Sequence, residues 1–167
     1  MWLFRLELAV GRIGLDQNIL SINAFQVNVP SYNIDPIIVH HLNQDVKMAG
    51  RPTLGNMQVS FYTGYNKDAV EQLERWQHLI YRPSSEVLGF AASYKVNGTL
   101  VVYAVDNTDW KEYQLLGVWP AVIGDREYEW TASDNVTRTA VFEVDKVLAP
   151  SDRNSFGPAR SSLFPVA

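Results

Sequence analysis

The spacing of apolar residues changes between positions 57 and 80, and this change constrains the fold more than any other feature. Met57, Val59 and Phe61 alternate with polar residues, a period of two that is typical of a half-buried strand. After Gly64 the apolar residues recur every three or four positions, which places them on one face of a helix. This core-facing side consists of Ala69, Leu73, Trp76 and Ile80. A helix with one apolar face needs a sheet to pack against, so the rest of the chain is expected to supply one.

Both ends of this helix have sequence signals. Asp68 followed by Glu71 fits a capping box, in which side chains bond to free backbone N–H groups. Arg82 precedes Pro83, and the residue before a proline is disfavoured in the helical conformation. The helix is therefore predicted over residues 68–82. Its polar side, expected to face away from the sheet, consists of Glu71, Gln72, Glu74, Arg75 and His78.

Most of the other segments have strand-like patterns. The first two strands are close in sequence and are predicted to pair as a hairpin. A second hairpin is predicted at Asn97-Gly98, because both residues favour the turn that joins paired strands. Pro120 is expected to end a strand, and residues 43–56, with Gly50 and Pro52, are predicted to form an extended loop. The predicted strands cover residues 2–10, 19–29, 37–42, 57–62, 86–96, 99–105, 111–119, 126–131 and 137–147.

The length of 167 residues is typical of a single domain. We expect this β-rich domain to cover residues 1–148. Residues 149–167 are rich in Ser, Pro and Gly and are expected to form a mobile tail. No stretch approaches the roughly 18 apolar residues that a membrane helix requires. Arg5 and Glu7 interrupt the first apolar run, so neither a signal peptide nor membrane insertion is expected.

Composition excludes several classes of function. The formal net charge is −4, whereas nucleic-acid-binding surfaces usually carry a basic excess. The chain contains no Cys, which excludes disulfides, thiolate metal sites and cysteine nucleophiles. Hydrophobic residues make up 47% of the chain, enough to form a folded core.

The residues that could support catalysis do not form a recognisable site. His40 and His41 are adjacent, so on a strand they point to opposite faces. Paired carboxylates at Glu127 and Glu129 and at Glu143 and Asp145 each share a strand face, but acid–base chemistry also needs a pocket that separates their pKa values. A solvated acidic face is the simpler interpretation. Nucleotide-binding, hydrolase and metalloprotease motifs are absent from the sequence, so we predict neither an enzyme nor a bound cofactor.

The predicted sheet has a consequence for assembly. An antiparallel sheet of this size has edges, and an exposed edge is a site for pairing with another chain. Identical subunits that pair head to tail can close into a ring.

Two passages resemble the tail tube proteins of contractile-tailed bacteriophages. The first has Ala49-Gly50-Arg51 before a strand and a helix that carries Trp76-Gln77. The second contains, in the order found in that family, Gly117-Val118-Trp119-Pro120, Tyr128-Glu129-Trp130, Ser133-Asp134-Asn135 and a strand from Thr139 to Val144. The resemblance extends over about 100 residues, whereas residues 30–41 match loosely and the segment after Leu148 extends beyond the usual end.

The resemblance implies an antiparallel β-sandwich or β-barrel with a flanking α-helix, as the subunit of a tube. Such subunits form hexameric rings that stack into a hollow conduit inside a contractile sheath, through which genomic DNA passes without specific binding. The implied partners are further copies of the chain and the sheath, baseplate and tail terminator proteins. The implied location is the virion tail, assembled in the host cytoplasm. Related folds build bacteriocin, injection-system and type VI secretion tubes.

We expect particular residues to line the lumen or to contact other subunits. A lumen for DNA should be acidic or neutral, because each contact between a phosphate and a cation slows transit. The lumen candidates are Glu127, Glu129, Glu143 and Asp145. Contacts to the next ring are expected from the predicted extended loop over residues 43–56, through Lys47, Ala49, Gly50, Arg51 and Asn56. The outer helix face, through Glu71, Glu74 and Arg75, is expected to contact neighbouring subunits or the sheath.

Three alternatives remain open at this stage. The tube could belong to a bacteriocin or another injection system, in which the cargo is protein. A carbohydrate- or small-ligand-binding β-sandwich could use aromatic stacking. A hydrolase could use Glu127 or Glu143. The aromatic candidates for ligand stacking are Trp2, Trp110, Trp119 and Trp130.

Overall fold

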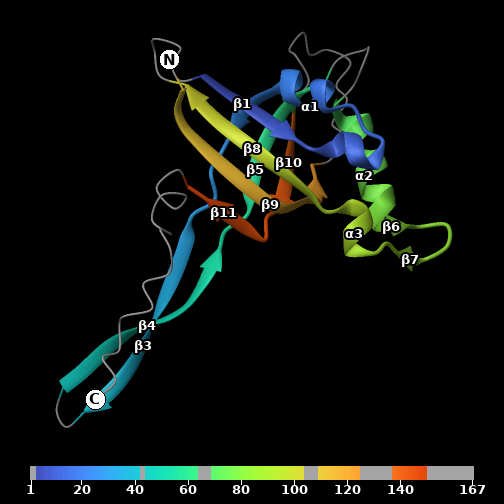
Figure 1. Ribbon diagram of the computed structural model, residues 1–167. Helices are drawn as coiled ribbons and strands as arrows, with labels where there is room; N and C mark the ends of the chain where they lie inside the picture. The colour runs from blue at the N-terminus through green and yellow to red at the C-terminus, as the bar shows by residue number, and fades with distance from the viewer. Residues whose placement is uncertain (1–2, 42–43, 64–68, 104–108, 125–136, 150–167) are drawn as a thin grey trace, which may run out of the picture.

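The computed structural model describes residues 3–41, 44–63, 69–103, 109–124 and 137–149, and these form a β-sandwich with helices along one side and a long projecting hairpin (Figure 1). The predicted mainly-β fold with antiparallel sheets and a flanking helix is confirmed. Among the described helices, none is long and apolar enough to span a membrane.

One long strand, β9 (Asp109–Ile123), holds the two layers together. Its first part pairs with β8 (Val96–Tyr103) and β11 (Lys146–Leu148), and β8 pairs in turn with β1 (Leu3–Leu8). Its last part pairs with β10 (Thr137–Glu143), which continues to β5 (Met57–Tyr62) and β2 (Ala24–Val27). All of these pairs are antiparallel. We call the two layers the β8 layer and the β5 layer.

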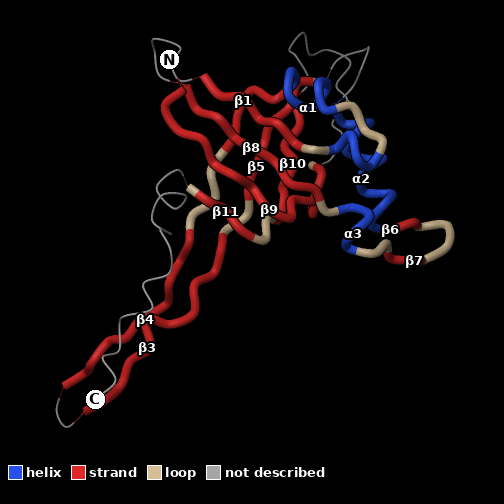
Figure 2. Tube along the Cα trace, viewed as in Figure 1, coloured by secondary structure: helices blue, strands red, loops and turns tan. Residues whose placement is uncertain are grey.

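The core lies between these layers and is closed by helix α2 (Ala69–Ile80) (Figure 2). The alternation predicted for β5 is confirmed, because Met57, Val59 and Phe61 are fully buried. Ala69, Leu73 and Trp76 are also fully buried, as the helical spacing predicted, and Ile80 is half-buried. The Trp76 ring lies 5.9 Å from the ring of Phe142 on β10. Gln72, expected on the polar face, is buried instead.

The prediction of a strand over residues 19–29 is largely wrong. Residues 10–13 form a 3-10 helix, η1 (Val10–Ile13), and α1 (Gln17–Asn23) follows. The Asp16 side chain caps α1 by accepting a hydrogen bond of 2.9 Å from the Asn18 N–H. Only β2 remains as a strand, and it pairs with β5, so the predicted hairpin with the first strand does not form. A further short helix, α3 (Ala91–Tyr94), replaces part of the predicted strand over residues 86–96.

The prediction of an extended loop over residues 43–56 is also wrong. This segment is mostly β4 (Gln44–Leu54), which pairs along its length with β3 (Tyr32–His41). The residues that suggested a loop are accommodated by a bulge in a two-stranded ribbon. Gly50 lies where a Cβ would overlap the Asp35 carbonyl, and Pro52 tolerates its missing N–H because both strands are edges.

Asn97-Gly98 does not form a turn, because both residues lie inside β8. Two residues of β9, Leu116 and Gly117, lie opposite Asn97 in a bulge, and the positive φ of 68° occurs at Gly117. Gly98 is needed for a different reason, since a Cβ there would overlap the backbone and side chain of β1. Pro120 does not end its strand either, because β9 continues to Ile123 and pairs Pro120 with Phe142.

Several predictions fall outside the described residues. They are the Asp68 cap, the strand over residues 126–131 and residues 150–167 of the predicted tail. The proposed domain boundary at 148 coincides with the end of β11 and stays a prediction.

Candidate assembly surface

The hairpin of β3 and β4 is the most prominent surface feature of the chain (Figure 1). Its strands have 10 and 11 residues, so at about 3.3 Å per residue the ribbon reaches roughly 33 Å. Every residue of β3 is exposed, and so is nearly every residue of β4. A two-stranded ribbon is marginal in water on its own, which suggests that it is stabilised by contact with another molecule.

One face of the outer half of this ribbon is apolar. Ile37 pairs with Met48 and Val39 pairs with Val46, and strand periodicity places all four side chains on the same face. Their exposed fractions lie between 41% and 56%. We call these four residues the hairpin face.

The opposite face of the ribbon is more polar. Lys47 pairs with Ile38, and His40 Nδ1 lies 2.6 Å from Asp45 Oδ1 across the two strands. The residues predicted to contact the next ring therefore lie on or near this ribbon. Lys47, Ala49, Gly50 and Arg51 are in β4, and Asn56 lies between β4 and β5.

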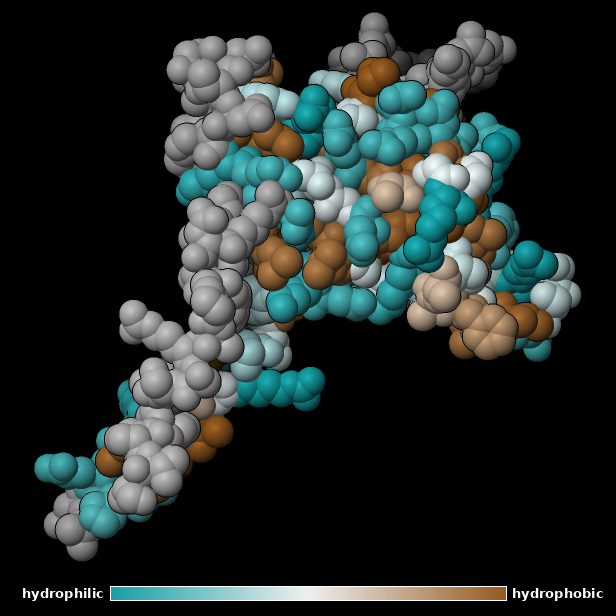
Figure 3. Space-filling model, viewed as in Figure 1, coloured by the Kyte–Doolittle hydropathy of each residue, from teal (hydrophilic) through white to brown (hydrophobic). Residues whose placement is uncertain are grey.

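A second exposed apolar surface lies at the turn after α2. The short strands β6 (Tyr81–Arg82) and β7 (Val87–Leu88) pair there and project away from the sandwich. Leu88 is 72% exposed and Phe90 is 87% exposed, and Val87 is also exposed. We call Val87, Leu88 and Phe90 the turn surface. Figure 3 shows apolar side chains gathered over this part of the molecule.

A groove of about 330 Å³ adjoins the turn surface. Its apolar lining comes from the end of α2 and from β9, whose Trp119 ring packs 5.9 Å from the ring of Tyr94. Its polar lining comes from Glu74, Gln77 and His78. The apolar lining residues are Ile80, Tyr81, Pro83, Trp119, Pro120 and Ala121.

The outer faces of the two layers differ in charge. On the β5 layer the outward side chains are neutral apart from Glu143, and Ser60 Oγ lies 3.0 Å from Thr139 Oγ1 across two strands. On the β8 layer, Arg5 forms an ion pair of 3.0 Å with Glu7, and Lys146 adds a second cation. The described outward residues of the β5 layer include Gln26, Gln58, Ser60, Tyr62, Val122, Thr137, Thr139, Val141 and Glu143.

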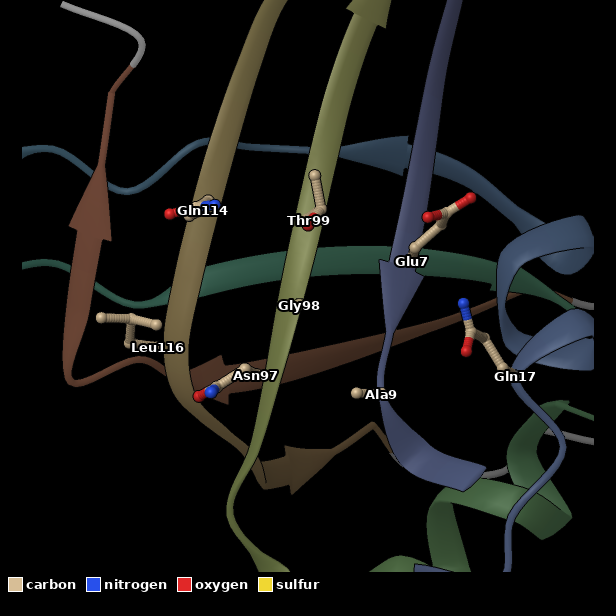
Figure 4. A pocket seen from close by; sticks show the side chains of 8 residues that line it. All are labelled: Glu7, Ala9, Gln17, Asn97, Gly98, Thr99, Gln114 and Leu116. Carbon is tan, nitrogen blue, oxygen red and sulfur yellow. The ribbon is translucent and has the colours of Figure 1, made fainter. Parts of the chain in front are cut away.

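A shallow hollow of about 320 Å³ lies on the outer face of the β8 layer (Figure 4). Glu7 on β1, Gln17 at the start of α1, Thr99 on β8 and Gln114 on β9 line it. A single carboxylate among amides and a hydroxyl offers hydrogen bonding but no acid–base pair. Within the described residues, no group of three or more His, Asp or Glu side chains could hold a metal ion.

Known proteins resemble this chain in sequence and in fold. No family model matches the chain. The tail tube protein gp19 of Enterobacteria phage T4 is 26% identical over 122 residues, covering 72% of this chain and 73% of the relative, and gp19 of Enterobacteria phage T6 gives the same values. The chain is similar in sequence to phage tail tube proteins.

Solved structures share the fold of this chain. A chain in the sheath–tube complex of the PVC extracellular contractile injection system superposes with a TM-score of 0.64 at 14% identity, covering 87% of this chain and 86% of that one. A chain in the tube-terminating cap of the anti-feeding prophage gives 0.65, also at 14% identity and with the same coverage. The sandwich with its flanking helix is therefore the fold found in these contractile assemblies.

Two of the four acidic residues predicted to line a lumen, Glu143 and Asp145, lie within the described residues. Glu127 and Glu129 lie outside the described residues. Glu143 is half-buried at the end of β10, whereas Asp145 lies in the bend that follows. The Asp145 carboxylate accepts hydrogen bonds of 2.7 and 2.8 Å from Lys95 Nζ. Glu143 and Asp145 therefore do not share a strand face.

The polar helix face has two distinct ion pairs. Glu71 and Arg75 form an exposed pair of 2.6 Å across one helical turn. Glu74 lies 3.9 Å from Arg138, whose side chain is only 5% exposed. Glu74 thus pairs with a buried side chain, although helical periodicity places it on the polar face. Sequence reasoning also missed the hairpin face and the turn surface, although the exposed aromatic Phe90 beside Gly89 gave a weak signal.

Proposed function

We propose that the chain is a structural tail tube subunit of a contractile-tailed phage. The observation that carries this proposal is the agreement of two comparisons, because the sequence matches tail tube proteins over 72% of the chain and the fold matches injection-system assemblies over 87%. Copies form hexameric rings that stack into a hollow tube inside a contractile sheath. Baseplate and terminator proteins lie at the two ends of the tube, and genomic DNA passes through it without specific binding. The subunit has no enzymatic role.

The outer face of the β5 layer lines the lumen. Its described residues include no Lys, Arg or His, whereas the β8 layer presents Arg5 and Lys146. Hydroxyl and amide side chains with Glu143 neither attract the DNA polyanion nor hold it by ion pairs. Of the two acidic candidates among the described residues, Glu143 lies on this face.

Ring closure uses the open edges of the β5 layer. This layer ends at β2 on one side and at the last part of β9 on the other. An edge strand presents unpaired N–H and C=O groups that a second chain can pair with. A head-to-tail pairing of these two edges generates a ring. The projecting hairpin, including Lys47 to Arg51, contacts copies in the next ring.

The exposed part of the polar face of α2, with Glu71 and Arg75, contacts the sheath. The complete particle is a virion tail that assembles in the host cytoplasm. Electron microscopy of the purified protein tests the proposal, and the expected result is six-fold rings or tubes. A protein that stays monomeric at high concentration would contradict it.

An injection-system tube is the second candidate, and the fold neighbours favour it to the extent that they come from such assemblies. The two readings differ in cargo. Capsid and terminase genes beside this gene indicate a phage, whereas an effector gene without a capsid gene indicates an injection system. Ligand binding by a carbohydrate module has less support, because Trp119, one of its candidates for aromatic stacking, packs against Tyr94.

A further inference from the structure

Two exposed apolar surfaces project from different sides of the sandwich. The hairpin face (Ile37, Val39, Val46 and Met48) lies on the outer half of the ribbon, and the turn surface (Val87, Leu88 and Phe90) lies beyond the end of α2. Figure 1 shows the two segments extending in different directions. Contiguous exposed apolar patches on a folded protein mark interaction sites. Because the two surfaces point apart, neither covers the other within one molecule.

The chemistry of the turn surface favours a permanent contact. This argument rests on the proposed function, in which the sheath contracts around the tube and its contacts must release. Permanent interfaces are more hydrophobic than transient ones. The polar face of α2, with the exposed ion pair of Glu71 and Arg75, suits a contact that releases. The turn surface, with Phe90 87% exposed, suits a contact that is kept, and a second copy of this chain is the permanent partner.

The two surfaces differ in shape, because one lies on a projecting ribbon and the other adjoins a groove. The hairpin is a narrow ribbon, and the turn surface adjoins a groove of about 330 Å³ with a mainly apolar lining. Tyr81 connects the turn surface to the groove, because it belongs to β6 and also lines the groove. A contact between two hairpin faces would be isologous and would close a dimer, whereas a contact between unlike surfaces continues from copy to copy. Only the second arrangement builds a tube.

We propose that the hairpin face of one copy packs against the turn surface and the adjoining groove of the next copy. Met48 and Val39 supply apolar side chains to this contact, and Leu88 and Phe90 receive them. The polar face of the ribbon, with Lys47 and the pair of His40 and Asp45, points away from the turn surface in this contact and is left to meet other parts of the neighbouring copies.

Disulfide trapping tests this contact directly, because the chain contains no Cys and every disulfide must come from an engineered pair. Met48→Cys and Leu88→Cys are prepared as separate proteins with tags of different length, mixed, allowed to assemble and oxidised. Lys47→Cys is the matched control, because it is the next residue on the same strand and points to the opposite face. Non-reducing electrophoresis separates mixed dimers from dimers of one variant.

The expected result is a mixed dimer of Met48→Cys with Leu88→Cys, formed at least about tenfold more than with Lys47→Cys, because cysteines whose Cβ atoms point apart cannot be bridged. Dimers of Met48→Cys alone would overturn the proposal in favour of contact between two hairpins. Tubes seen by electron microscopy without the mixed dimer would also overturn the proposed contact. The tube function would then still stand, and the turn surface would be assigned to another partner such as the sheath. A mixed dimer without rings or tubes would support the contact and contradict the tube function. If neither the mixed dimer nor rings or tubes form, the contact and the tube function are both contradicted.

Discussion

At the scale of single residues, Gly117 shows how a local backbone conformation fixes the junction of three elements. Its φ is 68°, and its N–H donates to Asn97 Oδ1 over 3.2 Å. A Cβ at this position would overlap the Asp145 carboxylate, which Lys95 holds. The bulge in β9 therefore sets the positions of both the start of β8 and the bend before β11.

We expect Gly117→Ala to destabilise the fold by about 2 kcal/mol or more, because the left-handed conformation costs an L-residue roughly 1–2 kcal/mol and the carboxylate must also move. Gly11→Ala is the control, since a Cβ there meets no atom within 4 Å. Urea denaturation of each variant measures the difference. Equal stability of the two variants would show that the bulge tolerates a side chain.

Trp76 gives a second prediction at this scale. Its indole Nε1 donates a hydrogen bond of 2.7 Å to the Tyr94 carbonyl, and the ring is fully buried. Trp76→Phe leaves that carbonyl without its donor, at a cost of about 1–3 kcal/mol, and Trp76→Ala adds a cavity for a total of about 3–5 kcal/mol. Thermal melting should rank the wild type, the Phe variant and the Ala variant in that order. A Phe variant as stable as the wild type would show that the hydrogen bond contributes nothing.

At the scale of elements, the predictable parts were those with one buried and one exposed face. Strand β5 and helix α2 alternate between core and solvent, so their periodicity was visible in the sequence. The hairpin of β3 and β4 has no buried face within one chain, so burial imposes no alternation on its sequence. Gly50 and Pro52 then suggested a loop, although a bulged ribbon accepts both.

Strand pairing was beyond the reach of local patterns. Leu8 on β1 pairs with Gly98 on β8, about 90 residues later, and the Asn97-Gly98 signal pointed to a turn instead. The assembly surface was likewise only partly predictable from local sequence patterns. The segment around Lys47 was assigned to assembly because of its unusual length, but which side chains shared a face depended on a register that only the structure provides.

We expect Val39→Lys to abolish assembly while the monomer stays folded, because the hairpin face contributes to no core. Placing a lysine charge in an apolar contact costs several kcal/mol, which lowers the association constant by about a hundredfold or more. His40→Lys is the matched control on the opposite face of the same strand, and its cation retains Asp45 as a partner. Sedimentation measures assembly, and circular dichroism measures folding. Normal assembly of Val39→Lys would remove the hairpin face from the interface.

At the scale of the whole molecule, the two layers place different chemistry on opposite sides of the sandwich. A tube built from such subunits has its inner surface on one layer and its outer surface on the other. The outward residues of the β5 layer, neutral apart from Glu143, suit the inside, and the charged residues of the β8 layer suit the outside.

We expect Gln58→Cys in assembled tubes to react with a small maleimide but slowly with a maleimide carried on a long polymer, because the polymer enters a narrow lumen with difficulty. Arg5→Cys, on the outer face of the β8 layer, should react with both reagents. Gel shifts over time give the rates. The reverse pattern would place the β8 layer on the lumen.

The sharing of β9 between the layers has a mechanical consequence. Its 15 residues are hydrogen-bonded to β8 and β11 at one end and to β10 at the other, so a force that separates the layers must shear this strand from several neighbours at once. Such a connection distributes load over many backbone hydrogen bonds loaded in parallel, and neither layer can yield first. A wall made of these units should behave as a stiff spring up to a sharp rupture force, with little gradual softening.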